Sequence, residues 1–265
     1  MNERDDHDAL VDLFAPALGD SPPSAAGGMR ERLLARAAAS RARHAGQRTV
    51  RTREGAWRTL KAGVRAKTLY DGPHGSSVLI ELAPGASLPP HRHRHLEEGI
   101  VLRGSMQMGE LDLGPGDYHV SAPGSRHATI TSRDGCLTYL RGSSLGSTVG
   151  LVIELLGGLL PGEGAAPITV TIEDGVWRPL ADGVEEKGLW HDDELISRFL
   201  RFAPGASLPA VACTRDTEVQ LVSGEVFCGD ILLCQQDFHL LPAGTELQEL
   251  SSDVGGVVFI HGRFS

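Results

Sequence analysis

The sequence predicts an all-β protein of two tandem jelly-roll barrels, preceded by a short helical N-terminal segment. Three observations lead to this fold class: the chain repeats itself, its apolar runs are short, and turn residues interrupt it throughout. The 265 residues suffice for two ordinary domains, and 41% of them are hydrophobic, as in globular proteins. The 33 glycines and 15 prolines suit short strands better than long helices.

An internal repeat sets the domain organisation. "GAWRTLKAGVRAKTLY" begins at Gly55 and "GVWRPLADGVEEKGLW" at Gly175, and "APGASLPP" and "APGASLPA" follow at the same offset of 120 residues. One offset that holds without gaps indicates duplicated domains. We predict a helical segment with a linker over residues 1–50, one barrel over 51–150 and a second barrel over 151–265.

Each copy has the pattern of strands. "SSVLIELAPG" and "ISRFLRFAPG" are short apolar runs that end in Pro-Gly, and "GIVLRGSMQMGELDLGPGDYHVSAPG" alternates between turn residues. This spacing favours an antiparallel sandwich or barrel, and roughly 100 residues per copy fits the size of a jelly roll.

The N-terminal segment is different in character. "DALVDLFAPAL" predicts a short helix, "GDSPPSAAGG" a linker, and "MRERLLARAAASRARH" a longer helix. In the last, apolar residues recur at helical spacing and arginines are expected on the other face. Either this helix is a solvated arm that packs on a barrel or on a second subunit of a homodimer, or it docks an acidic partner.

Several classes of function are disfavoured. The net charge of −9 argues against direct nucleic-acid binding. The acidic opening "MNERDDHDAL" lacks the basic start of a signal peptide, and the apolar stretch "TVGLVIELLGGLLPG" is too short to span a membrane and carries Glu154. The four cysteines show no Cys-x-x-Cys spacing. We therefore expect free thiols and a cytoplasmic location.

The stretch "PPHRHRHLEEGIVLRG" predicts a metal site. His91 and His93 are two residues apart, so in a strand they project from the same face. Glu97 can join from the neighbouring strand if residues 94–96 form the turn, and His127 follows a Pro-Gly turn that can aim it at the same point. Three imidazoles and one carboxylate suit zinc, iron, manganese, copper or nickel.

Three nearby residues are expected to play other parts. His95 lies in the presumed turn and should face solvent. Glu98 points to the opposite strand face from Glu97. His119 has a counterpart, His239, in the second copy, where the histidine cluster is missing, so a structural role is the simpler interpretation.

These residues resemble the motifs of the cupin superfamily. The first cupin motif reads Gly, five residues, His-x-His, three or four residues, Glu, six residues, Gly, and this chain matches it at Gly85, His91, His93, Glu97 and Gly104. The second motif is recognisable in "GDYHVSAPGSRH". The resemblance implies a metal-binding jelly-roll barrel.

Within the superfamily, "PPHRHRHLEEGIVLRGSM" and "GDYHVSAPGSRH" are most similar to ChrR-type cupins. The resemblance implies a divalent metal, zinc first, with His91, His93, Glu97 and His127 as ligands. It also implies an extracytoplasmic-function sigma factor as partner, here through residues 1–50. The family's sigma-binding domain usually carries a His-x-x-x-Cys-x-x-Cys zinc site, whereas this chain has no cysteine before Cys136.

The second copy lacks the ligands. The offset places Val211, Cys213, Thr217 and Leu247 where the first copy has His91, His93, Glu97 and His127. We expect a degenerate barrel without metal ligands, retained for packing or for binding a small molecule.

Three functions remain open on the sequence alone. The protein is a regulatory, anti-sigma-related metal-binding cupin, or a metal-dependent enzyme such as a small-molecule dioxygenase or hydrolase with iron or manganese, or a small-ligand sensor with a structural metal. Met106, Met108 and Tyr118 either line the barrel cavity or belong to the core.

Overall fold

The computed structural model describes residues 23–144 and 165–264. The chain divides into two compact units, Met1–Ala45 and Gly46–Ser265, which are described separately. The helix predicted over residues 8–18 and the apolar stretch of residues 148–162 lie outside the described residues.

The first unit contains helix α2 (Pro23–Arg43). It begins inside the segment predicted as a linker, because proline is tolerated in the first turn of a helix, where its missing N–H has no partner to lose. Met29, Leu33 and Leu34 are 57%, 60% and 60% exposed. At 3.6 residues per turn, Arg30 lies between Leu33 and Leu34 around the axis, so the basic residues do not form the separate face that we expected.

In the described part of the chain, we find no helix with the length and apolar character needed to cross a membrane.

The regular elements of the second unit are β-strands. Its first barrel has two main sheets. The larger sheet, in spatial order, consists of β14 (Ile168–Val170), β10 (Tyr118–Ser121), β7 (Glu97–Gly104), β13 (Cys136–Ser143), β4 (Gly75–Leu82), β3 (Val64–Gly72) and β2 (Arg58–Lys61). The smaller consists of β5 (Ser87–Leu88), β12 (Ile130–Thr131), β8 (Met106–Met108) and β9 (Leu111–Leu113), and a separate pair of β11 (Arg126–His127) and β6 (His91–Arg92).

The second barrel repeats this plan. Its main path, in spatial order, consists of β1 (Arg48–Val50), β22 (Phe238–Leu241), β20 (Thr217–Cys228), β25 (Gly256–Gly262), β17 (Ile196–Phe202), β16 (Val184–His191) and β15 (Arg178–Ala181). The remaining strands are β18 (Ala206–Leu208), β24 (Leu250–Ser252), β21 (Ile231–Cys234), β19 (Val211–Ala212) and β23 (Glu246–Leu247). The predicted all-β fold of two tandem barrels is confirmed.

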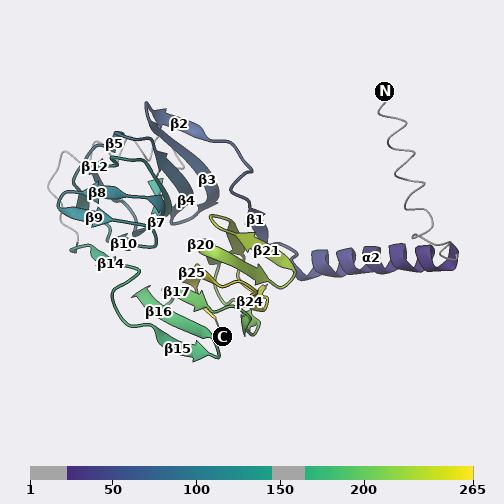
Figure 1. Ribbon diagram of the computed structural model, residues 1–265. Helices are drawn as coiled ribbons and strands as arrows, with labels where there is room; N and C mark the ends of the chain where they lie inside the picture. Colours follow the sequence, from purple (N-terminus) through teal and green to yellow (C-terminus); the bar gives the residue numbers. More distant parts are fainter. Residues whose placement is uncertain (1–22, 145–164, 265) are drawn as a thin grey trace, which may run out of the picture. The chain divides into compact units, whose positions relative to one another are not determined.

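Each barrel receives its outermost strand from the segment that precedes the other barrel. Strand β1 precedes the first barrel but pairs with β22 of the second, and β14 precedes the second barrel but pairs with β10 of the first (Figure 1). The two barrels are therefore joined by reciprocal strand exchange. The domain boundaries at residues 50 and 150 stay a prediction.

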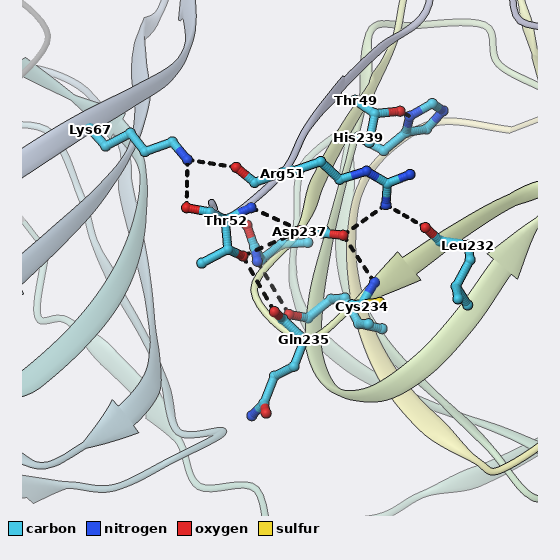
Figure 2. Close-up of polar contacts among 11 residues, drawn as sticks. Thr49, Arg51, Thr52, Lys67, Leu232, Cys234, Gln235, Asp237 and His239 are labelled. Carbon is cyan, nitrogen blue, oxygen red and sulfur yellow. Dashed lines mark hydrogen bonds and ion pairs between the residues drawn. The ribbon is translucent and has the colours of Figure 1, made fainter. Parts of the chain in front are cut away.

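Figure 2 shows how the β1 segment is fastened. Asp237 of the second barrel accepts hydrogen bonds from Arg51 Nη1 at 2.8 Å and from the Thr52 amide at 2.9 Å. Lys67, on β3 of the first barrel, donates to the carbonyls of Arg51 and Thr52 at 2.7 and 3.0 Å. The segment is thus bound to both barrels at once.

The same contacts hold the other exchanged segment, at positions related by the 120-residue offset. Asp117 of the first barrel accepts from the Ile172 amide at 2.9 Å, and Lys187 of the second barrel donates to the carbonyls of Thr171 and Ile172. The duplication therefore extends to the contacts that hold the exchanged segments.

The apolar core has three parts. One cluster fills the first barrel around Val78 and Val101, and a second fills the second barrel around Val219 and Leu221. The third lies between the barrels and draws Tyr139 from the first and Phe259 from the second. Burial of this shared cluster by both barrels favours a single folded body.

A buried polar cluster accompanies the shared core. Arg141 of the first barrel lies 3.3 Å from Glu98 of its own barrel and 3.1 Å from Glu218 of the second. His261 of the second barrel lies 3.1 Å from Glu98. Both carboxylates are at least 94% buried as side chains, so Arg141 is the cation that holds them across the interface.

The repeated glycines have a steric reason. Gly104 and Gly224 both have φ of 73°, and a Cβ on either would lie about 2 Å from the carbonyl oxygen of Gly135 or Gly255. Only glycine fits this left-handed, crowded position.

Candidate metal centre

The register of two short strands brings the predicted ligands together. In the antiparallel pairing of β6 with β11, His127 is the direct partner of His91. His93 follows β6, the chain bends at residues 94–95, and Glu97 opens β7. The turn expected between His93 and Glu97 is therefore present.

Three of the four predicted ligands form a compact set. One ligand atom from each of His91, His93 and Glu97 lies within 4.8 Å of the others. His93 Nδ1 is 3.6 Å from a Glu97 oxygen, and the two side chains are 1% and 11% exposed. This cluster can hold a metal ion.

His127 lies next to this set. Its ring centroid is 5.4 Å from that of His91 and 4.6 Å from that of His93. Its Nε2 forms a 2.9 Å hydrogen bond with the Ser121 hydroxyl. Its part as the fourth ligand stays a prediction, and a metal would compete with Ser121 for that nitrogen.

Burial keeps the imidazoles neutral. Burial lowers the pKa of His93 to about 4. Burial, with the nearby His93, His91 and His119, lowers the pKa of His127 to about 2. Burial also lowers the pKa of His91. At neutral pH these rings keep the nitrogen lone pairs that a metal requires.

The Glu97 carboxylate and the two ring nitrogens of His93 also suit a bound cation. Burial raises the pKa of Glu97, against the opposing effects of His91 and the Ser143 hydroxyl. Both ring nitrogens of His93 are buried without a hydrogen-bond partner among the described residues. A divalent ion would satisfy a His93 nitrogen and compensate the buried carboxylate, so the donor set fits such a metal.

A cavity opens beside the candidate ligands. It leaves about 60 Å³ for the centres of water-sized molecules, which is room for a few waters or a very small ligand. His91, Glu97 and His127 form one part of its wall together with His119, Ser121 and Ser143. The rest is mostly apolar and includes Met106 and Met108, so these two line the cavity as well as belonging to the core.

Tyr118 does not line this cavity. Its ring belongs to the cluster between the barrels, and its hydroxyl donates to Glu98 at 2.7 Å. Glu98 faces away from the ligands, as strand parity predicts, but it is buried between the barrels. Burial by itself raises the pKa of Glu98, but His261 and Arg141 outweigh this effect and lower that pKa to about 2.

Two histidines near the cluster have distinct surroundings. His95 is half-buried in the bend and is not part of the three-residue set. His119 pairs through Nδ1 with the Thr169 hydroxyl at 2.8 Å, which agrees with a structural role, but its ring also lines the cavity. Sequence reasoning missed this second feature. The spacing of His119 and Ser121, which share a strand face, was the available signal.

The second barrel preserves the register without the ligands. Val211 of β19 is the direct partner of Leu247 of β23, as His91 is of His127. Cys213 and Leu247 are buried in the apolar cluster of this barrel. Within the described residues, the second barrel holds no candidate metal cluster. The four cysteines are free, and three of them are buried.

The first barrel is similar in sequence to known proteins. Residues 45–145 match the ChrR cupin-like domain family. The anti-sigma-E factor ChrR of Cereibacter sphaeroides is 33% identical over 77 residues, which are 29% of this chain and 36% of that protein. The match thus spans about a third of the length of this curated relative.

Solved structures with two barrels are similar over most of the chain. A candidate dioxygenase of Nostoc punctiforme has a TM-score of 0.60 and 15% identity, over 83% of this chain and 82% of its own. Oxalate decarboxylase of Lactobacillus farciminis has a TM-score of 0.57 and 14% identity, over 81% and 85%. At these identities the likeness shows the fold alone, which is that of two tandem barrels.

Proposed function

We propose that this chain, whose residues 45–145 match the ChrR cupin-like domain family, is a metal-binding regulatory protein related to anti-sigma factors. One observation carries this proposal: the set of half-buried His91 with buried His93 and Glu97 lies inside the segment that matches the ChrR family.

In this proposal His91, His93, Glu97 and His127 hold one zinc ion. A bound zinc would supply a fixed positive charge and Lewis acidity. The chain's own residues supply the rest: the barrel excludes most water, burial keeps the imidazoles neutral, and Ser143 orients Glu97 by a hydrogen bond. Metal binding then adds to the folding free energy of the first barrel.

The proposed partner is a sigma factor, bound through residues 1–50. The support is the partial similarity to the anti-sigma-E factor ChrR of Cereibacter sphaeroides and the composition of α2, where Met29, Leu33 and Leu34 are exposed among arginines. Such a surface suits a partner with an apolar groove and acidic rim.

A pull-down of the full chain from its native cell tests the partner. We expect a sigma factor to copurify with the wild type and to be lost with Leu33→Asp, which replaces an exposed apolar side chain with a charge. Ala35→Asp, on the opposite side of the helix, is the matched control and should retain the partner. Equal recovery with both variants, or no sigma factor with the wild type, would contradict the proposal.

The cavity beside the ligands favours a second candidate, a metal-dependent small-molecule enzyme. The Nostoc punctiforme protein of similar fold, a candidate dioxygenase, gives further support for this kind of enzyme. Elemental analysis of protein from its own host separates the two: zinc near one per chain favours regulation, and iron or manganese favours catalysis. Oxygen uptake by iron-loaded protein on a panel of small diketones would support the enzyme, and silence with tightly held zinc would exclude it.

A further inference from the structure

Two histidine–threonine pairs hold the exchanged strands. His239 of β22 meets Thr49 of β1, with 2.9 Å between Nδ1 and Oγ1, as Figure 2 shows. His119 of β10 meets Thr169 of β14, with 2.8 Å between the same atoms. The 120-residue offset relates both members of the pairs, so the two rings are held in the same way.

In the second barrel the other ring nitrogen is satisfied. His239 Nε2 lies 3.1 Å from Gln47 Oε1. Gln47 Nε2 donates to the Glu246 carbonyl at 3.0 Å, which assigns Oε1 as the end that accepts. His239 therefore carries its proton on Nε2, and its Nδ1 accepts from the hydroxyl of Thr49.

In the first barrel this partner is missing. The residue equivalent to Gln47 is Pro167 (47 + 120 = 167), whose side chain has no hydrogen-bonding atom. His119 Nε2 is buried and has no hydrogen-bond partner among the described residues. In the tautomer that His239 adopts, this nitrogen carries a proton, and a buried N–H without a partner costs free energy.

This histidine belongs to the wall of the metal cavity. Its ring lines the same space as His91, Glu97 and His127, and its centroid is 5.1 Å from that of His127. A small molecule in this cavity would therefore lie next to the His119 ring.

We propose that His119 is the hydrogen-bond donor that orients a small oxygen-containing ligand in the first-barrel cavity. This inference rests on the proposed metal site. In it, the Nε2–H of His119 donates to one oxygen of the ligand while another oxygen faces the metal, and the hydrogen bond between Nδ1 and Thr169 holds the ring in place.

The cavity limits the class of ligand. The space of about 60 Å³ for the centres of water-sized molecules suits a very small ligand, and the described lining includes no lysine or arginine. A divalent ion bound by the Glu97 carboxylate would have a net charge of +1, next to a cavity wall that is mostly apolar. A monocarboxylate matches that charge, whereas a dicarboxylate would leave an uncompensated negative charge.

The test uses the full chain loaded with cobalt(II) and titrated with sodium acetate, followed by visible absorption of the cobalt. We expect His119→Phe to bind cobalt like the wild type and to weaken acetate binding about 10- to 100-fold, the effect of losing one hydrogen bond to a charged group. His239→Phe, the matched control in the second barrel, should leave acetate binding unchanged. His119→Gln, which keeps a donor of similar reach, should restore most of the affinity.

A second variant keeps His119 but gives its Nε2 a hydrogen-bond partner within the protein. Pro167→Gln rebuilds the second-barrel arrangement, so its amide oxygen should occupy His119 Nε2 and weaken acetate binding about tenfold without loss of cobalt.

The outcomes separate this inference from the proposed function. Wild type that does not bind cobalt overturns both. Cobalt binding with equal acetate affinity in wild type and His119→Phe overturns the inference alone. Loss of cobalt in His119→Phe makes His119 a metal ligand and also overturns it.

Discussion

His91 and His127 are direct partners across β6 and β11, although they lie far apart in the sequence. Val211 and Leu247 hold the same relationship in the second barrel. Strand register alone therefore brings the two positions together in both copies, and side-chain chemistry decides which copy can bind a metal.

His93→Ala should abolish metal binding, because it removes a ligand at the centre of the cluster. Wild type with free zinc at about 1,000 times its Kd gains about 4 kcal/mol from the ion, and the variant should lose this gain. The measurement is zinc content together with urea unfolding in zinc and in chelator. His95→Ala, in the adjacent bend, is the control and should retain the metal. Full zinc content in His93→Ala would contradict the site.

The metal-free protein should lose stability in acid. The pKa of His93 is about 4 when folded against 6.5 for the free side chain, so the unfolded state gains a proton first as the pH falls. Stability should be greatest above about pH 6.5 and decline between pH 6.5 and 4, by up to ~1.4 kcal/mol per pH unit for each such histidine. The raised pKa of Glu97 opposes this in part.

Urea unfolding in chelator across this range measures the effect. His127→Asn should reduce the slope, because it removes one buried imidazole with a depressed pKa. A stability that stays level from pH 7 to 4.5 would show that these histidines are not buried as neutral groups.

Arg141→Met should destabilise the second unit by about 3–5 kcal/mol, because it leaves Glu98 and Glu218 buried without their shared cation. Arg215→Met removes the exposed ion pair with Glu194 and should cost less than about 1 kcal/mol. Denaturant unfolding of both variants gives the comparison. Similar small losses would mean that the interface does not depend on the Arg141 pairs.

Asp237→Ala should release the β1 segment, because it removes the acceptor for Arg51 and the Thr52 amide. Hydrogen exchange should show faster exchange at residues 48–52. Asp117→Ala is the matched variant and should affect residues 168–172, since Asp117 accepts from the Ile172 amide. Unchanged protection of both segments would contradict this account of the exchanged strands.

Part of this molecule could be predicted because the signals are local. The repeat at one offset predicted two similar barrels, and His91, His93 and Glu97 occur within one turn between two strands, where parity sets their direction. The helix start at Pro23 was missed because proline in "SPPSAAGG" was taken as part of a linker, although it fits a first turn.

By itself the sequence determined the duplicated all-β fold, the cluster of His91, His93 and Glu97, and its absence from the second copy. Only the tertiary structure decided that β1 and β14 exchange barrels, that Glu98 is buried against Arg141, and that His119 lines the cavity with an Nε2 that has no partner among the described residues. The reason is physical: spacing and periodicity set local geometry, whereas exchange, burial and pairing depend on contacts between segments distant in the chain, which no local pattern records.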